Sequence, residues 1–237
     1  RHPKLAGTSH VAEELLGRAA YGVSELGREA ISEAAIVGNP GCFAVGMILG
    51  LAPVFNDGLV ADGIVTVDGL TGSSGAGKAP SPLQHLSHLN DNVIPYRVLN
   101  HQHVIESEFT LGRLGQASGA ELDFVPHLLG TTRGILSTMH MRLNQSVSRE
   151  SLLERYCEFY EGDHFVRVLD TPPTLKNVAG SNFCDVSVFP SEDGKRLVVI
   201  SSIDNLMKGQ SGSAMQNLNL MFGLPETTGL DRTPLYP

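Results

Sequence analysis

The spacing of apolar residues predicts a chain that begins with short helices and then becomes a mixture of strands and helices. Helical patterns cover residues 10–20 and 25–35, and residues 35–38 are typical of a short buried strand. Residues 39–41 are Asn-Pro-Gly, which predicts a tight turn. The dense apolar run at 42–49 indicates a buried helix, so the turn joins a strand to a helix.

After this helix the apolar pattern predicts several strands. We expect them at residues 63–68, 121–126, 134–143, 165–169, 182–189 and 196–203. We expect further helices at 103–114, at 148–160 and from about 209–212 to Phe222. Because the strands are grouped rather than strictly alternating with helices, the sequence predicts an α+β fold.

Composition and charge exclude several classes of function. The chain of 237 residues has a net charge of −8, and its 17 basic residues form no cluster, so we expect no nucleic-acid partner. No apolar run approaches the roughly 20 residues that a bilayer span needs, and no signal peptide is recognisable, so we expect a cytoplasmic protein without a membrane partner. Cys42, Cys157 and Cys184 are widely spaced, without a Cys-x-x-Cys pair, which favours a reducing compartment and argues against a metal site.

Cys42 is the strongest candidate for a catalytic residue. A thiol at a helix N-terminus lies at the positive end of the helix dipole, which lowers its pKa and favours the nucleophilic thiolate. The free N–H groups there can also hold an oxyanion. A cysteine on a buried helix is more often an inert small side chain, but the Asn-Pro-Gly corner at 39–41 is expected to present Cys42 at the mouth of the fold.

A second candidate is the pair of histidines at the start of the helix predicted at 103–114. If that helix begins near His103, then His103 and Glu106 share a face, and the carboxylate can orient the imidazole. A metal site with His101 and His103 lacks a third ligand at a characteristic spacing. Two surface histidines at a loop–helix junction remain the alternative interpretation.

Two further segments carry groups that suit an anion. The Gly-rich residues 70–78 offer backbone amides and the cation of Lys78 to a phosphate or a flat cofactor ring, although they form neither a Walker A loop nor a complete dinucleotide fingerprint. Arg133 has the geometry to clamp a carboxylate or phosphate. A flexible surface loop and a solvated arginine are the respective alternatives.

Taken together, these segments resemble the N-acetyl-gamma-glutamyl-phosphate reductases of arginine biosynthesis, in the aspartate-semialdehyde dehydrogenase-like group. Residues 21–26 are similar to the family's Tyr-Gly-Leu-Pro-Glu-Leu, and 38–43 to its cysteine motif. Residues 72–78 are similar to Gly-Val-Ser-Gly-Ala-Gly-Arg, with Lys78 for Arg. Residues 101–106 match His-Arg-His-Thr-Pro-Glu, with the Arg and the Thr-Pro replaced.

The resemblance implies a fold and a reaction. It implies a mixed or antiparallel-sheet catalytic and dimerisation domain at 41–205, with remnants of a Rossmann domain at 1–40 and 206–237. It implies NADPH-dependent reduction of N-acetyl-gamma-glutamyl phosphate to the semialdehyde and phosphate, through a thioester on Cys42. It also implies a homo-oligomer, either a dimer or a tetramer.

The same resemblance suggests a role for each candidate residue. His103 is expected to act as acid and base, with Glu106 orienting it. The residues expected to contact the substrate are His101, Asn39, Arg133 and Lys78. The residues expected near the cofactor are Gly75, Gly77 and Asn205.

One departure from the family changes the expectation for cofactor binding. Family members have an N-terminal Rossmann domain, and nothing before Arg1 supplies its Gly-rich turn, so we expect a fragment or one piece of a split enzyme. Two other interpretations remain open. One is a reductase of carrier-linked aminoadipyl phosphate in lysine biosynthesis, and the other is a non-catalytic module of the same fold.

Overall fold

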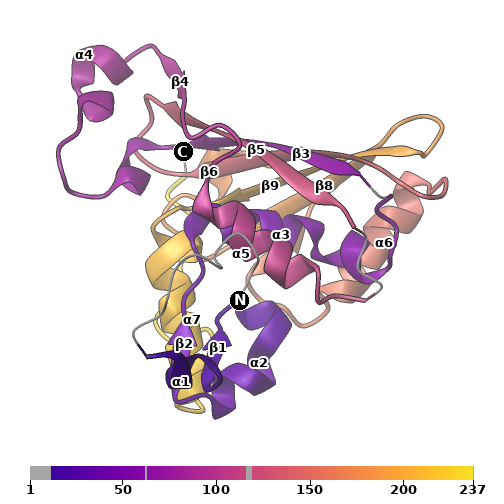
Figure 1. The fold of residues 1–237 in the computed structure, drawn as a ribbon, viewed down its shortest axis with the longest axis horizontal. Coiled ribbons are helices and arrows are strands. Elements are labelled where there is room, and N and C mark those ends of the chain that lie inside the picture. Colours follow the sequence, from indigo (N-terminus) through magenta and orange to yellow (C-terminus); the bar gives the residue numbers. More distant parts are fainter. Residues whose placement is uncertain (1–11, 62, 116–118, 237) are drawn as a thin grey trace.

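A seven-stranded mixed sheet organises the chain in the computed structural model, which describes residues 12–61, 63–115 and 119–236 (Figure 1). In spatial order the strands are β4 (Val93–Pro95), β5 (Glu121–Leu129), β3 (Ile64–Thr71), β6 (Ile135–Arg142), β9 (Arg196–Ile203), β8 (Cys184–Pro190) and β7 (Val166–Val168). The β3–β5 and β7–β8 pairs are parallel and the other four pairs are antiparallel. This arrangement confirms the predicted α+β class with a mixed sheet.

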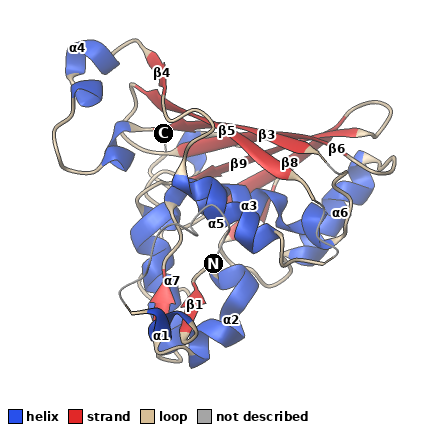
Figure 2. Cartoon of the chain, viewed as in Figure 1, coloured by secondary structure: helices blue, strands red, loops and turns tan. Residues whose placement is uncertain are grey.

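Three helices cover one face of this sheet: α3 (Cys42–Asn56), α5 (Gln102–Leu111) and α6 (Arg149–Phe159) (Figure 2). Helix α3 is apolar on all sides and residues 43–55 are all buried, because it lies against the sheet and the other helices at once. Pro53 has no N–H to donate to the carbonyl of Leu49, one turn earlier, and the hydroxyl of Tyr160 donates to that carbonyl instead. Among the residues that the structure describes, no helix is long and apolar enough to cross a membrane.

A smaller layer combines the beginning and the end of the described chain. It contains α1 (Glu13–Leu16), β1 (Ala19–Tyr21), α2 (Ser24–Glu33), β2 (Ile36–Gly38) and α7 (Gly212–Met221). β1 and β2 pair in parallel, and α2 packs against α7, so that the indigo and yellow segments meet in Figure 1. The predicted division of the chain at residues 41 and 206 stays a prediction.

The observed elements differ from the predicted ones mainly near the N-terminus. The helix expected at 10–20 is wrong, because Glu13–Leu16 is helical but Ala19–Tyr21 is a strand; residues 10 and 11 lie outside the described part. Strand β1 is too short to show a period of its own, and it is a strand because it pairs with β2. The long segment after β3 also contains elements that were not predicted: Ser73–Ala76, Pro82–Gln84, α4 (Leu86–Leu89) and β4.

Candidate active site

The corner between β2 and α3 places Cys42 as the first residue of the helix, as the sequence predicts. Gly41, the N-cap residue, allows the ring of His103 to approach the chain at this point. A Cβ at residue 41 would lie only 2.1 Å from Nε2 of His103. The structure therefore brings the predicted nucleophile and the predicted acid/base residue to the same corner.

A widened helical turn packs against Cys42. This segment, the π-turn (Met207–Ser211), leads into α7. A Cβ at Gly209 would lie 2.8 Å from the Cβ of Cys42, closer than real Cβ contacts come. Gly209 lets the π-turn pack directly against the nucleophile, and π-type turns of this kind are frequent at functional sites.

Cys42 opens into a cavity of about 910 Å³. Six of the residues singled out in the sequence line it: Asn39, Cys42, Gly75, His101, His103 and Asn205. Its lining does not include the other four, which are Gly77, Lys78, Glu106 and Arg133. The cavity thus collects residues from the turn after β2, from α3, from α5 and its N-cap, and from the loop after β9 around one thiol.

The thiol of Cys42 does not have the lowered pKa that its position at a helix N-terminus predicts. Burial raises the pKa to about 11, the carboxylate of Glu106 adds to this effect, and the backbone N–H groups of Phe43 and Cys42 lower the pKa only in part. The helix start does stabilise the thiolate, but the loss of solvation is larger. Little thiolate forms at neutral pH in this state, so the attack on a substrate requires a base.

His101 and His103 are both uncharged at neutral pH. Burial lowers the pKa of each imidazole to about 4, and the positive charge of Arg97 contributes in both cases. Both rings are therefore uncharged at pH values well above 4. His101 caps helix α5, because its Nδ1 accepts a hydrogen bond of 3.3 Å from the backbone N–H of His103. The Nδ1 atom of His103 is buried and has no hydrogen-bond partner among the residues that the structure describes.

Glu106 has a different position from the one predicted, and this corrects its expected role. One carboxylate oxygen accepts hydrogen bonds of 2.8 Å from the backbone N–H of Gly41 and from the hydroxyl of Tyr21. Within the described part of the chain, no hydrogen bond joins Glu106 to the imidazole of His103, and Nδ1 of that ring has no partner. Glu106 therefore supports the corner that carries Cys42 and connects it to β1. Sequence reasoning did not assign Tyr21 a role, although it begins the motif at 21–26.

Asn205 holds the Gly-rich turn after β3 in place. Its Oδ1 accepts a hydrogen bond of 2.8 Å from the backbone N–H of Gly134, and its Nδ2 donates one of 3.0 Å to the hydroxyl of Ser74. Gly75 lies beside this amide, where a Cβ would be 3.5 Å from Nδ2 of Asn205. The turn thus forms the wall of the cavity at Gly75 and Asn205.

Arg133 forms a structural ion pair and does not line the cavity. Its guanidinium forms an ion pair of 3.3 Å with Asp204, whose side chain is fully buried. Asp204 also accepts hydrogen bonds from the backbone N–H groups of Leu206 and Met207, which start the π-turn. Arg133 therefore helps to anchor the π-turn that packs on Cys42, and its predicted contact with a substrate stays a prediction.

Comparison of the sequence with known proteins shows which family the chain belongs to. Residues 42–205 match the semialdehyde dehydrogenase dimerisation domain. The chain is 47% identical over 232 residues to an N-acetyl-gamma-glutamyl-phosphate reductase of Desulforudis audaxviator, and 45% identical over 219 residues to one of Methanocaldococcus jannaschii. These alignments cover 96% and 92% of this chain and 66% and 63% of the two relatives. The chain belongs to the N-acetyl-gamma-glutamyl-phosphate reductase family.

Solved structures of aspartate semialdehyde dehydrogenases share the fold. Aspartate semialdehyde dehydrogenase II from Vibrio cholerae superimposes with a TM-score of 0.68 at 16% identity, over 87% of this chain and 69% of that one. The enzyme from Francisella tularensis gives 0.66 at 15% identity, over 86% and 71%. The chain spans about two thirds of the length of the curated N-acetyl-gamma-glutamyl-phosphate reductases that it matches.

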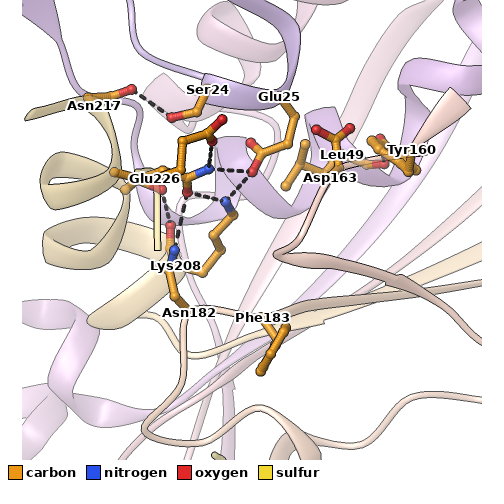
Figure 3. Close-up of polar contacts among 12 residues, drawn as sticks. Ser24, Glu25, Leu49, Tyr160, Asp163, Asn182, Phe183, Lys208, Asn217 and Glu226 are labelled. Carbon is orange, nitrogen blue, oxygen red and sulfur yellow. Dashed lines mark hydrogen bonds and ion pairs between the residues drawn. The ribbon is translucent and has the colours of Figure 1, made fainter. Parts of the chain in front are cut away.

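A buried ion pair behind the site connects the π-turn of this reductase-family chain to α2. The ammonium of Lys208 lies 2.5 Å from the carboxylate of Glu25, and the two side chains are 1% and 2% exposed (Figure 3). Gln216 on α7 accepts a hydrogen bond of 2.8 Å from Lys208 and donates one of 3.0 Å to Glu25. The residue after Lys208 is Gly209, so this pair positions the backbone that lies against Cys42.

Proposed function

We propose that the protein reduces N-acetyl-gamma-glutamyl phosphate to the corresponding semialdehyde and inorganic phosphate, with Cys42 as the nucleophile. The observation that carries the proposal is that Cys42 and His103 line the same cavity of about 910 Å³, with the ring of His103 packed on Gly41, the residue before Cys42, and Gly209 packed against Cys42 itself. The names of the related proteins support the same substrate class.

In the first step, the sulfur of Cys42 bonds to the acyl carbon as His103 takes the thiol proton. The imidazole is neutral, because burial lowers its pKa to about 4, so its ring nitrogen has a lone pair free to accept the thiol proton. The same burial makes the ring a weak base, and the anionic phosphate of the bound substrate raises the pKa of the imidazole and so favours the transfer. The bond between the acyl carbon and the phosphate oxygen then breaks, and phosphate leaves with its electron pair. Free N–H groups at the start of α3 are the natural donors for the oxyanion.

The reduction step requires a hydride donor, which we propose is NADPH. The residues that line the cavity near Cys42 fit the flat nicotinamide end, because Gly75, Ala76, Gly209 and Ala214 have small side chains or none. When bound, the cofactor supplies the hydride that reduces the thioester. Asn205 keeps the Gly-rich wall in position, and His103 returns its proton to the sulfur of Cys42 as the thiohemiacetal collapses to the aldehyde.

A carrier-linked aminoadipyl phosphate is the alternative substrate. It is one methylene longer, and a pocket discriminates one methylene by about 1–3 kcal/mol. The names of the relatives favour the glutamyl compound. We place the reaction in the cytoplasm, where a biosynthetic reductase has access to reduced cofactor.

We further propose that two copies of the chain associate through the sheet face opposite α3, α5 and α6. This face carries Ile64, which is 60% exposed, and a shallow cavity of about 760 Å³ between β3, β6, β8 and β9. The match to a dimerisation domain supports this assignment. Sedimentation velocity is expected to give a dimer or a larger even assembly, and Ile64→Lys is expected to weaken it; a monomer at micromolar concentration would contradict the proposal.

The test of the activity is turnover by the full-length protein that contains this chain. We expect NADPH oxidation that depends on N-acetyl-gamma-glutamyl phosphate, and Cys42→Ser is expected to abolish it while the circular dichroism spectrum is unchanged. Cys157→Ser is the matched control, because Cys157 is an exposed thiol on α6 and its loss should leave turnover intact. Full activity of Cys42→Ser would refute the mechanism, and a preference for the aminoadipyl compound would favour the alternative substrate.

A further inference from the structure

Two asparagine side chains connect the strand–helix corner that carries Cys42 to the last helix of the chain. Asn39 follows β2, and Asn217 lies on α7, where it is 3% exposed. The Nδ2 atom of Asn217 donates a hydrogen bond of 3.1 Å to Oδ1 of Asn39. These two residues, the amide pair, are 178 positions apart in the sequence. The fold therefore joins the corner to a distant helix at this point.

The side chain of Asn217 has a fixed orientation. Its Nδ2 atom also donates a hydrogen bond of 2.9 Å to the carbonyl of Gly22, and its Oδ1 accepts one of 2.8 Å from the hydroxyl of Ser24 (Figure 3). Gly22 permits this approach, because a Cβ at residue 22 would lie 2.3 Å from Nδ2 of Asn217. A buried amide with both donors and its acceptor in use has one stable orientation. Asn217 therefore presents an N–H group to Asn39 at a defined point.

The orientation of Asn39 follows from its partners. Its Oδ1 faces the N–H group of Asn217, so its Nδ2 faces the π-turn, where it donates a hydrogen bond of 3.1 Å to the carbonyl of Gln210. A backbone carbonyl can only accept, which agrees with an amide nitrogen at this position. Gln210 follows Gly209, which packs against Cys42. The side chain of Asn39 thus bridges the segment before the nucleophile and the π-turn beside it.

The amide pair provides a contact that the other supports of the π-turn lack. Asp204 holds the start of the turn, and Lys208 connects the turn to α2. Within the described part of the chain, the bond from Asn39 to Gln210 is the only side-chain hydrogen bond between residues 39–42 and the π-turn. The distance between the corner and the turn therefore depends on Asn39 and on the residue that orients it.

The state of the thiol depends on the π-turn staying in contact with Cys42. Burial is the largest cause of the raised pKa of this thiol, and the close approach of Gly209 contributes to that burial. A nucleophile must also keep its reacting geometry, because small displacements reduce the rate strongly. We infer that Asn217 is a positioning residue, which acts through Asn39 to hold the π-turn against Cys42.

Alkylation of Cys42 tests the amide pair without turnover. The full-length protein that contains this chain is treated with iodoacetamide at neutral pH, and peptide mass spectrometry compares the labelling of Cys42 with that of the exposed Cys157. When the pair is broken, the π-turn can move away, water reaches the sulfur and more thiolate forms. One hydrogen bond changes such an equilibrium by about two- to tenfold. We expect Asn217→Ala and Asn39→Ala each to speed alkylation of Cys42 by about this factor.

The double variant Asn39→Ala/Asn217→Ala separates action through Asn39 from action by another route. If Asn217 acts through Asn39, its substitution should add less than about twofold to the rate of the Asn39→Ala protein. A double-variant rate equal to the product of the two single effects would overturn the inference, as would unchanged rates in both single variants. Asn217→Ser, with a polar group too short to reach Asn39, serves the same test if Asn217→Ala does not fold.

Asn219→Ala is the matched control. Asn219 lies two residues further along α7, is 2% exposed, and donates hydrogen bonds of 3.0 Å from Nδ2 to the carbonyls of Glu226 and Thr228. Its substitution removes the same kind of buried contacts from the same helix, but none to the corner. We expect its alkylation rate to stay within about twofold of the unmodified protein. An increase as large as that in Asn217→Ala would show a general loosening of α7 and would overturn the inference.

Turnover of the full-length enzyme gives a second readout, and this part of the test rests on the proposed function. We expect Asn217→Ala and Asn39→Ala to reduce kcat about tenfold and to change KM less than about twofold, because the geometry of attack is lost rather than a substrate contact. A raised KM with unchanged kcat in Asn39→Ala would make Asn39 a substrate contact and would refute its positioning role. If the unmodified enzyme has no turnover with N-acetyl-gamma-glutamyl phosphate, the proposed function fails, whereas alkylation still decides whether Asn217 positions the π-turn.

Discussion

Removing the ammonium of Lys208 is expected to destabilise the protein strongly. Lys208→Met leaves the carboxylate of Glu25 buried, with a side chain that is 2% exposed, and takes away its ion-pair partner at 2.5 Å. Among the side-chain contacts of the described residues at the same oxygen, only the hydrogen bond of 3.0 Å from Gln216 remains. Breaking a buried pair from one side typically costs about 3–5 kcal/mol. Domains commonly have a free energy of unfolding of about 5–15 kcal/mol, so the loss is a large fraction of the total.

The assay is urea unfolding followed by circular dichroism, with Glu25→Gln/Lys208→Met as the matched control. We expect the single variant Lys208→Met to lose about 3–5 kcal/mol with an unchanged slope. The double variant removes both charges and keeps an amide beside Gln216. It should therefore recover most of the loss and come within about 1–2 kcal/mol of the unmodified protein.

The dependence on pH gives a second readout of the same pair. Burial by itself raises the pKa of Glu25, but the charge of Lys208 and the hydrogen bonds from Lys208 and Gln216 hold the pKa below its ordinary value. A lowered carboxyl pKa contributes stability above the unfolded pKa, about 4.3, and this contribution disappears as the pH falls through the folded value. The gap between Lys208→Met and the unmodified protein should therefore narrow in acid. A loss below about 1 kcal/mol, or a double variant as unstable as the single one, would refute the reasoning from buried charge.

Three further outcomes follow from contacts of the nucleophile. Gly209→Ala places a Cβ 2.8 Å from the Cβ of Cys42. We therefore expect slower alkylation of Cys42 and a loss of about 1–3 kcal/mol in the free energy of unfolding. An unchanged alkylation rate together with an unchanged stability would contradict the close packing. Because burial raises the pKa of the Cys42 thiol to about 11, its rate of reaction with iodoacetamide should keep rising above pH 9, and a plateau near neutral pH would show that the helix dipole dominates. Tyr21→Phe removes one hydrogen bond to Glu106 and should lower the free energy of unfolding by about 1 kcal/mol. It should also reduce kcat more than it changes KM. An effect on KM alone would argue against a role of Tyr21 in positioning the corner between β2 and α3.

Local patterns in the sequence determined the elements around which the site is built. The apolar run after Asn39-Pro40-Gly41 is long enough to specify helix α3, and the alternation in residues 134–143 specifies β6, because each signal lies within one element. The turn residues likewise placed Cys42 at the start of a helix. The histidine pair was located at the start of α5 for the same reason, and His101 is its N-cap residue.

Other features of the site come from groups that are distant in the chain. The carboxylate of Glu106 meets Gly41 and Tyr21, which are 65 and 85 residues away, although a helical face was expected to turn it toward His103. The hydrogen bond between Arg97 and Gln102 is close in sequence, yet its loop depends on backbone contacts with β5. Spacing within one segment contains no information about such partners.

What the sequence by itself determined is the chemistry that is present: a thiol at a strand–helix corner, a neighbouring histidine motif and the α+β class of the chain. What only the tertiary structure decided is the state of those groups. Cys42 has a raised pKa rather than a lowered one because packing of α3 against the sheet and the π-turn removes water from the thiol. The helix dipole is a local property that can be read from the order of residues, whereas desolvation is the sum of contacts from the whole fold.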